Sequence, residues 1–424
     1  MARRFYIETL GCPKNDVDSD KVAGTLLAEG YEQTDDPSRA DVVVVNTCAF
    51  IEEARKESVD TIRALDSARK RSSRLVVTGC MAERYGADLA GLVPEADQIA
   101  GFGVPIRLGR KPVAVSGEVP SFDLLNLPRP RSHAPWAYVK IAEGCDRNCG
   151  FCAIPGFRGP QRSRDPQSIL EEVERLGVRE VVLVAQDLAS FGKDRPDELG
   201  AGSIVPLVRE VAGLVDWVRL LYLYPSDLGD PLVSAILDSG VPYFDLSLQH
   251  VSKPHLRRMR RWGDGARFLE RIRKIRAAEP GAVFRSNFIV GYPGETEEDH
   301  DELLRFVEEA RLDWCGFFAF SPEEGTHALT LPDRVPASLM NERLIELREM
   351  QEAITVAARD DLVGSDVRVL VESTGTARSY REAPEIDGII HVDPALVPGE
   401  FHDVAITGSL GPDLIAAGAA PVGE

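Results

Sequence analysis

The sequence predicts an α/β protein built from an N-terminal parallel α/β domain, a central partial (β/α)6 TIM-like barrel and a C-terminal small antiparallel β-barrel. Apolar strand-like runs alternate with helical patterns in the first hundred residues, a second series of alternations fills the middle of the chain, and short strand-like runs between glycine and proline turns occupy its end. A chain of 424 residues is too long for one compact domain. We therefore expect three domains, spanning residues 1–130, 131–356 and 357–424.

In the N-terminal part, each of three strand-like runs ends beside a cysteine: Cys12, Cys48 and Cys80. The runs cover residues 5–10, 41–46 and 74–79, and helical patterns at 18–29 and 49–70 separate them. Alternating strands and helices indicate a parallel sheet, whose strands end at one edge where ligands bind. The three cysteines are therefore expected to form one metal site, although each could instead be a small buried apolar residue.

A proline-containing stretch over residues 103–135 is interpreted as a linker. Beyond it, six strands are predicted near 137–142, 180–184, 217–221, 243–247, 283–290 and 314–320, with clear helices at 166–176, 266–279 and 295–311. Six units are too few for a closed eight-stranded barrel but suffice for an open one, with its active site at the carboxyl ends of the strands.

The last part of the chain begins after a helix predicted at 336–361. Strands at 366–372, 388–392 and 402–406 predict the small antiparallel barrel. Residues 362–424 contain ten acidic and three basic side chains. Such a surface is poorly suited to binding RNA phosphates.

Composition indicates a soluble, cytoplasmic protein, because no apolar segment is long enough for a signal peptide or a membrane span. In a reducing compartment, the seven cysteines favour metal or redox chemistry over disulfides. The net charge of −19 disfavours nucleic acid and would attract a basic protein, although solubility alone could also account for it.

The loop EGCDRNCGFCAIP carries Cys145, Cys149 and Cys152 directly after the first strand of the central barrel. Zinc would require a fourth nearby cysteine or histidine, a disulfide would leave one thiol unpaired, and the polar loop does not suit a buried core. An iron-sulfur cluster held by three thiolates, with one iron open to another ligand, fits best.

The spacing CxxxCxxC after a strand resembles the radical S-adenosylmethionine superfamily. This resemblance implies that S-adenosylmethionine chelates the open iron, and that one electron from the reduced cluster cleaves it to methionine and a deoxyadenosyl radical. Phe151, between two ligand cysteines, would then reach the adenine through its backbone. Residues at barrel strand ends are further candidates for binding S-adenosylmethionine or substrate: Gln186, Asp187, Ser247, Gln249 and, in the turn VGYPGET, Gly291.

Nearly the whole chain resembles the RimO-type branch of the methylthiotransferase family, through residues 8–20, 137–164, 184–192, 246–261 and 288–296. The resemblance implies two 4Fe-4S clusters, with Cys12, Cys48 and Cys80 holding the second, and a C-terminal TRAM-like domain. It also implies methylthiolation of the β-carbon of an aspartate in small-subunit ribosomal protein S-twelve. The tRNA-modifying branch usually has glutamine and methionine where this chain has Pro13 and Lys14. This chain departs mildly from the family pattern at Asp20, where glutamate is commoner.

The implied partners are ribosomal protein S-twelve, an electron donor and a sulfur donor, with no membrane and with tRNA less favoured. Two alternatives stay open: the same chemistry on a tRNA adenosine, and a non-catalytic metal-binding RNA adaptor. Two groups of arginines are interpreted as solvated faces, with carboxylate binding as the alternative, and Cys315 is assigned to the core. The arginines are Arg158, Arg162 and Arg164, and Arg257, Arg258, Arg260 and Arg261.

Overall fold

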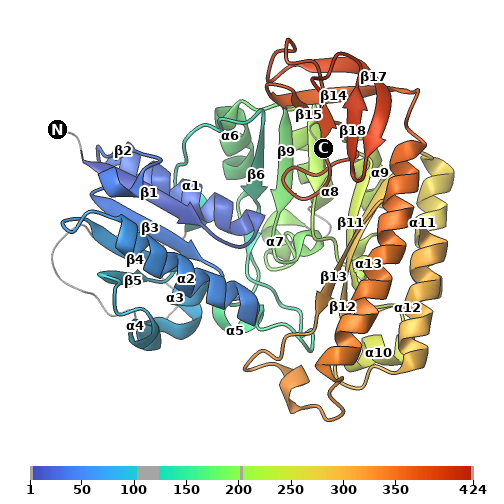
Figure 1. Ribbon diagram of the computed structural model, residues 1–424, viewed down its shortest axis with the longest axis horizontal. Helices are drawn as coiled ribbons and strands as arrows, with labels where there is room; N and C mark the ends of the chain where they lie inside the picture. Colours follow the sequence, from blue (N-terminus) through green and yellow to red (C-terminus); the bar gives the residue numbers. More distant parts are fainter. Residues whose placement is uncertain (1–2, 103–123, 201–203, 422–424) are drawn as a thin grey trace.

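The computed structural model describes residues 3–102, 124–200 and 204–421, so most of the predicted linker lies outside the described residues (Figure 1). The N-terminal domain, the central barrel and the C-terminal barrel are three distinct bodies in contact with one another. The α/β fold class predicted from the sequence is confirmed. Among the described helices, none has the length and apolar character needed to cross a membrane.

The N-terminal domain is a five-stranded parallel sheet of order β2-β1-β3-β4-β5 with helices packed on it. Its central strand, VVVVNT, is buried at every position because helices cover both faces of the sheet. The elements are β1 (Arg4–Thr9), α1 (Pro13–Ala28), β2 (Glu32–Gln33), β3 (Val42–Thr47), α2 (Glu52–Ala68), β4 (Arg74–Gly79), α3 (Cys80–Tyr85), α4 (Leu89–Leu92) and β5 (Gln98–Ala100).

The central domain is an open, six-stranded parallel barrel. Strands pair in the orders β6-β9-β10 and β11-β12-β13, and a parallel bridge between Leu223 and Leu246 joins the two halves. Its strands are β6 (Trp136–Lys140), β9 (Glu180–Val184), β10 (Trp217–Leu220), β11 (Tyr243–Gln249), β12 (Val283–Val290) and β13 (Trp314–Ala319). Its main helices are α6 (Pro166–Leu176), α8 (Ile204–Ala212), α9 (Asp230–Leu237), α11 (Gly265–Ala278) and α12 (Glu297–Ala310).

The central domain also contains shorter elements. They are β7 (Ala142–Glu143), α5 (Ile154–Arg158), β8 (Arg162–Ser163), α7 (Pro196–Leu199) and α10 (Lys253–Arg258). The hairpin-like pairing of β7 with β8 is antiparallel and brackets the loop that carries Cys145, Cys149 and Cys152.

Helix α13 (Ala337–Asp360) leads to a closed C-terminal barrel of order β14-β15-β16-β18-β17. Its pairs are antiparallel except for β16 with β18, which run parallel. The strands are β14 (Asp366–Ser373), β15 (Thr376–Arg378), β16 (Ile390–His391), β17 (Phe401–Leu410) and β18 (Asp413–Ala416).

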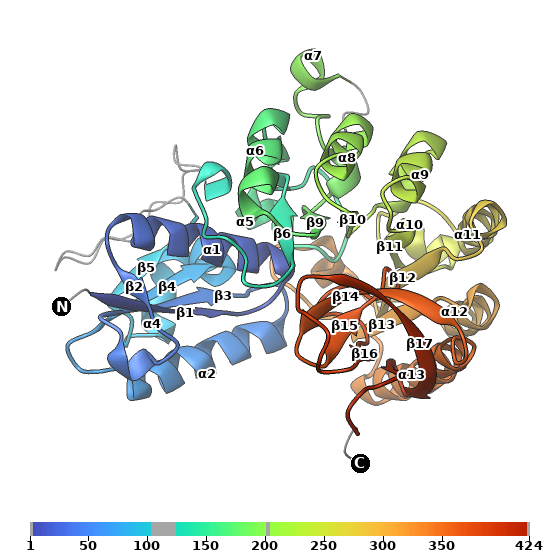
Figure 2. The ribbon, with the colours of Figure 1, turned by 90° about the horizontal axis from the view of Figure 1, so that it is seen from above.

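The C-terminal barrel packs on the amino ends of the central strands (Figure 2). Arg378 donates to Glu180, the first residue of β9, at 2.8 Å, and the indole of Trp314, which begins β13, donates to the Arg381 carbonyl at 2.8 Å. The carboxyl ends of the same strands are therefore left to form the site that faces the N-terminal domain.

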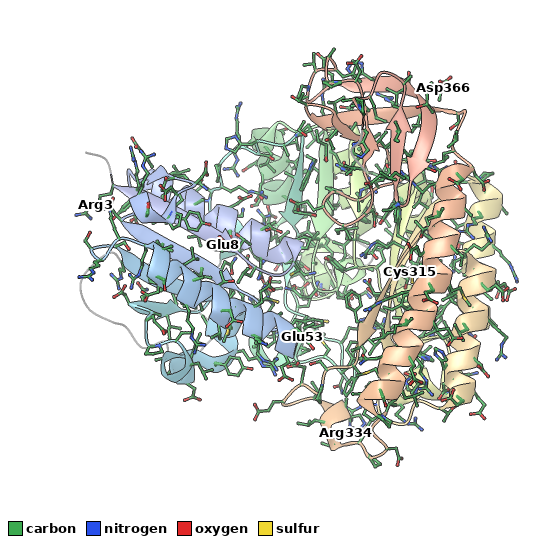
Figure 3. The ribbon with its side chains drawn as sticks, viewed as in Figure 1. Arg3, Glu8, Glu53, Cys315, Arg334 and Asp366 are labelled. Carbon is green, nitrogen blue, oxygen red and sulfur yellow. The ribbon has the colours of Figure 1, made fainter. Side chains whose placement is uncertain are left out.

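Cys315 lies on β13, which packs against α13 (Figure 3). Its side chain is partly buried against the main core of the central domain, as the sequence predicts.

Candidate active site

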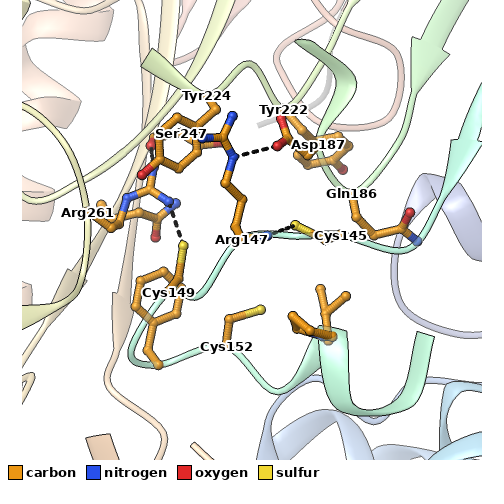
Figure 4. Close-up of a pocket in the computed structure, with 14 residues that line it drawn as sticks. Cys145, Arg147, Cys149, Cys152, Gln186, Asp187, Tyr222, Tyr224, Ser247 and Arg261 are labelled. Atoms are coloured by element: carbon orange, nitrogen blue, oxygen red, sulfur yellow. Dashed lines mark hydrogen bonds and ion pairs between the residues drawn. The ribbon is translucent and has the colours of Figure 1, made fainter. Parts of the chain in front are cut away.

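One cavity opens at the carboxyl ends of the central strands and is lined by all three cysteines of the loop (Figure 4). Residues from strand β11, from the segments after β9 and β10, and from the start of α5, together with Arg261, complete its wall. Of the predicted contacts, Phe151, Gln186, Asp187, Ser247 and Gln249 line this cavity. The topology thus brings together side chains from distant parts of the sequence at the edge where a partial barrel binds its ligands.

Glycines allow the cysteine loop to approach its neighbours closely. At Gly144, where φ is +80°, an added Cβ would lie 2.0 Å from the Pro160 carbonyl oxygen. At Gly150 it would lie 2.5 Å from the Tyr292 hydroxyl. The Gly150 amide also donates to the Met259 carbonyl at 2.8 Å, which fixes the loop between β7 and α10.

Two of the three thiols in this loop, those of Cys145 and Cys152, are poorly suited to ionise without a bound cation. Burial raises the pKa of Cys145 to about 11 and that of Cys152 to about 12. Two donors nevertheless point at sulfur: Arg261 Nη1 lies 3.2 Å from Cys149 Sγ, and the Arg147 amide lies 3.4 Å from Cys145 Sγ. Buried thiols that receive hydrogen bonds on sulfur are what a metal centre requires of its ligands.

The separation of the sulfurs indicates the size of the group that they fit. Around a single zinc ion, with bonds of about 2.3 Å, the sulfurs would stand roughly 3.8 Å apart. Among the described residues, no cysteine trio has its sulfurs all within 4.8 Å of one another. The sulfurs of the loop are therefore not gathered as closely as a single ion would hold them, which leaves room for a larger group such as a 4Fe-4S cluster.

Five cavity residues were not anticipated as site residues, namely Arg147, Ile154, Pro155, Tyr222 and Tyr224, and Arg261 was considered only as a possible carboxylate-binding residue. Arg147 pairs with Asp187 at 2.6 Å and with Asp227, and its guanidinium lies 3.9 Å from the Tyr224 ring centroid. Arg147 lies inside the cysteine motif and Arg261 inside the basic run, so both carried a local signal. The two tyrosines follow β10 without any motif.

Gly291 is not among the residues that line the cavity. Its amide donates to the Glu295 carboxylate at 2.6 Å, φ is +84°, and an added Cβ would lie 2.4 Å from Met340 Sδ. The glycine thus serves a tight turn at the end of β12 and close packing with α13.

Tyr222 and Gln249 both have left-handed backbone conformations, with φ of 65° and 71°. Such conformations cost on the order of 1 to 3 kcal/mol in residues with a side chain, and they concentrate at functional sites. Tyr222 follows strand β10, and Gln249 is the last residue of the neighbouring strand β11. The backbone strain therefore lies at the wall of the cavity.

The structure also brings Cys12, Cys48 and Cys80 together, at the carboxyl ends of the adjacent strands β1, β3 and β4. An added Cβ at Gly11, beside Cys12, would lie 2.9 Å from Cys48 Sγ. Burial raises the pKa of Cys48 to about 12, with a further contribution from the charges of Cys80 and Cys12. The three thiols therefore lie at the same sheet edge, within electrostatic range of one another.

Arg158 connects the two cysteine trios. Its Nη2 donates to Cys80 Sγ at 2.9 Å, and its Nη1 donates to Glu143 at 2.8 Å. The Gln186 amide, at the wall of the first cavity, donates to the same Glu143 carboxylate at 2.6 Å. A continuous chain of buried hydrogen bonds thus runs from Cys80 through Arg158 and Glu143 to Gln186.

Burial corrects the interpretation of Arg158, Arg164 and Arg261 as solvated. All three are buried, and Arg164 pairs with Glu172 at 2.7 Å. Burial alone would raise the pKa of Glu143, but Arg158 and Lys140 beside it hold that pKa well below its ordinary value. Part of the missed signal is long-range, because Arg158 also donates to Asn15 and Cys80 of the N-terminal domain.

A third cluster, formed by His250, His255 and Glu295, is compact enough for a single ion. Arg343 already neutralises Glu295 at 2.7 Å. His250 Nδ1 accepts a hydrogen bond from the Ser252 amide at 3.1 Å, which leaves the proton of the neutral ring on Nε2. His250 Nε2 and both ring nitrogens of His255 have no hydrogen-bond partner among the described residues, whereas the Glu295 carboxylate is already engaged by Arg343 and the Gly291 amide.

Comparison with known proteins places this architecture in a class. The profile of the radical SAM superfamily matches residues 139–307, that of the TRAM domain matches 363–418, and that described as uncharacterized protein family UPF0004 matches 4–101. The solved structure of the radical S-adenosylmethionine methyltransferase TsrM from Kitasatospora setae aligns over 77% of each chain, with a TM-score of 0.52 and 15% identity, which shows a shared fold. The fold and its cysteine loop are thus those of a radical S-adenosylmethionine enzyme.

Curated relatives narrow the class to a family. The ribosomal protein uS12 methylthiotransferase RimO of Anaeromyxobacter sp. (strain K) is 41% identical, covering 98% of this chain and 93% of the relative. That of Moorella thermoacetica is 42% identical, over 92% and 94%, and that of Streptomyces coelicolor is 39% identical, over 98% and 96%. The chain belongs to this RimO family of radical S-adenosylmethionine methylthiotransferases, and S-adenosylmethionine and a 4Fe-4S cluster are the cofactors that the class implies.

Proposed function

We propose that this enzyme transfers a methylthio group to the β-carbon of an aspartate in ribosomal protein uS12, using two S-adenosylmethionine molecules and two 4Fe-4S clusters. The observation that carries the proposal is the pair of cysteine trios, with Arg158 and Glu143 linking Cys80 of one trio to Gln186 at the cavity wall of the other. The names of its relatives support uS12 as the substrate.

The three domains divide the work in this proposal. Residues 131–356 hold one cluster on Cys145, Cys149 and Cys152, residues 1–130 hold the other on Cys12, Cys48 and Cys80, and residues 357–424 form the TRAM-like domain. No side-chain base can deprotonate an unactivated carbon, so the reaction requires a radical. When bound, the first cluster would supply the electron that cleaves S-adenosylmethionine, and the second would take part in delivering sulfur.

The chain itself binds and orients the reactants. Gln186, Ser247 and Gln249 present polar groups to the cavity, and Phe151 lies between two of the cysteines. Arg147, fixed between Asp187 and Tyr224, closes one wall and limits the access of water. An external electron donor and a sulfur donor complete the reaction.

Anaerobic assays with purified uS12 and with tRNA, each followed by mass spectrometry, test the proposal. We expect the added methylthio group on an aspartate of uS12 and none on tRNA, in keeping with the acidic C-terminal domain. Modification of a tRNA adenosine instead would overturn the choice of substrate. Iron and sulfide analysis of the anaerobically prepared protein should give two clusters per chain.

The Cys149→Ala and Cys48→Ala variants separate the two trios. Without Cys149, no S-adenosylmethionine should be cleaved, because the first cluster loses a ligand. Without Cys48, cleavage to deoxyadenosine should continue while sulfur insertion stops. Normal sulfur insertion by the Cys48→Ala variant would remove the role of the second site.

A further inference from the structure

Lys14 is a buried lysine that forms no ion pair within the part of the chain that the structure describes. The other buried lysines do: Lys21 lies 2.6 Å from Glu172, and Lys140 lies 2.7 Å from Glu143. A buried ammonium without an ion pair is costly, because desolvation removes its water shell and contact with an aromatic ring replaces that shell only in part. Among the buried lysines that the structure describes, Lys14 is therefore the one without a directly paired carboxylate.

The position of Lys14 links the two sites. It lies two residues after Cys12 in the first turn of α1, and its Nζ stands 3.3 Å from the centroid of the Tyr222 ring. The same tyrosine lines the cavity of the first trio. Lys14 thus occupies the boundary between the second cysteine trio and the cavity in which S-adenosylmethionine is proposed to bind.

The carboxylate that faces this boundary from β11 is already engaged. Asp245 accepts a hydrogen bond from the Tyr222 amide at 2.9 Å and pairs with Arg285 at 3.4 Å. Arg285 in turn reaches Asp387 at 3.3 Å. These contacts satisfy Asp245 without Lys14, so the ammonium stays available to an incoming anion.

We propose that Lys14 binds the carboxylate of the target side chain and so selects an aspartate for modification; this inference rests on the proposed function. In aspartate the β-carbon is bonded directly to the carboxyl carbon. A carboxylate held by Lys14 therefore places the β-carbon next to the boundary between the two trios, where hydrogen removal and sulfur addition must both occur. A neutral asparagine would lack the charge that Lys14 requires.

The test compares binding of two forms of purified uS12 to the anaerobically reconstituted enzyme. One is the natural protein, and the other has asparagine at the aspartate that mass spectrometry identifies as modified. We expect the wild-type enzyme to bind the aspartate form at least tenfold more tightly. Lys14→Met and Lys14→Gln should reduce this preference to less than twofold, while Lys56→Met, on the exposed face of α2, should keep it.

In the competing explanation, Lys14 only balances the charge of the second cluster and does not bind the substrate. The iron content and the electron paramagnetic resonance spectrum of each sample show whether a Lys14 variant has altered that cluster. A preference retained in both Lys14 variants, with or without an altered spectrum, overturns the inference but leaves the proposed function intact. Failure of the wild-type enzyme to bind or modify uS12 overturns the proposed function itself. Loss of the preference with wild-type iron content supports the assignment of Lys14.

Discussion

Each cysteine trio receives a hydrogen bond from one arginine, Arg261 at Cys149 and Arg158 at Cys80. Hydrogen bonds and positive charge at a ligand sulfur stabilise the more reduced, more negative form of a cluster. The two arginines come from different segments, so the two centres can be tuned separately.

Replacing Arg261 with methionine should make the midpoint potential of the first cluster more negative, because the reduced form loses a donor and a nearby positive charge. A redox titration followed by electron paramagnetic resonance measures the change. Arg257→Met, at an exposed position of α10, is the matched control and should leave the potential unaltered. Equal potentials in the two variants would show that Arg261 only supports the loop.

Because His255 is buried, we expect the stability of the folded protein to depend on pH. Burial lowers the pKa of His255 to about 4, below the ordinary value of about 6.5, so between these values the unfolded chain binds a proton that the folded chain does not. The free energy of unfolding should therefore fall as pH drops through this window, by up to about 3 kcal/mol from this residue.

Urea unfolding at pH 7 and pH 4.5 measures this dependence. His255→Leu should reduce it, since leucine fills the space without titrating, whereas His133→Leu, at an exposed position, should not. An unchanged pH dependence in His255→Leu would assign the effect to other groups.

The candidate site could be predicted only as far as local patterns reach. The spacing of Cys145, Cys149 and Cys152 is visible in a dozen residues, and the other trio follows from strand ends. The roles of Arg158 and Tyr222 depend on partners contributed by other domains, which no local period encodes. Lys14 combines a local and a long-range feature. Its position two residues after Cys12 is visible in the sequence, but the lack of an ion pair for its ammonium is visible only in the described part of the structure.

At the scale of elements, the central strands begin and end within a few residues of their predicted bounds, because most of their residues are apolar. The strands that sequence reasoning missed include β2, β5, β8, β15 and β18, of two to four residues each. Such short runs show no period, and their neighbours in the sheet define them.

The turn between β4 and α3 offers a test at this scale. Gly79 has φ of +91°, and an added Cβ would lie 2.2 Å from Asn46 Oδ1 and 2.6 Å from the Thr47 carbonyl. Gly79→Ala should therefore cost more than about 2 kcal/mol of stability and displace Asn46, whose amide holds the start of α1.

We expect Gly79→Ala to lose about half of the bound iron while still cleaving S-adenosylmethionine, as measured by iron analysis and deoxyadenosine production. Gly91→Ala, where an added Cβ meets nothing within 4 Å, should retain all of the iron. A full iron complement in Gly79→Ala would show that the turn can relax without disturbing the second site.

For the whole molecule, a buried ionic network fastens the C-terminal barrel to the central domain. Glu180 accepts from Arg219 and from Arg378, each at 2.8 Å, and Arg378 also donates to Glu372 at 2.7 Å. Removing one member of such a network costs about 3 to 5 kcal/mol, because the remaining buried charges lose their partner.

Arg378→Met should therefore lower the thermal unfolding midpoint and expose the segment between α13 and β14 to limited proteolysis. Arg368→Met, on the exposed side of β14, should change neither measurement appreciably. Protection of the segment in Arg378→Met would indicate that apolar contacts alone, such as that of Trp217 with Phe401, hold the barrel in place.

The bond from Arg158 to Cys80 means that the short helix following one trio also supports the other. Attack by oxygen on the first loop would therefore spread to the second. We expect air-exposed molecules that have lost the first centre to have lost the second as well, whereas loss of the second alone should leave the first in place.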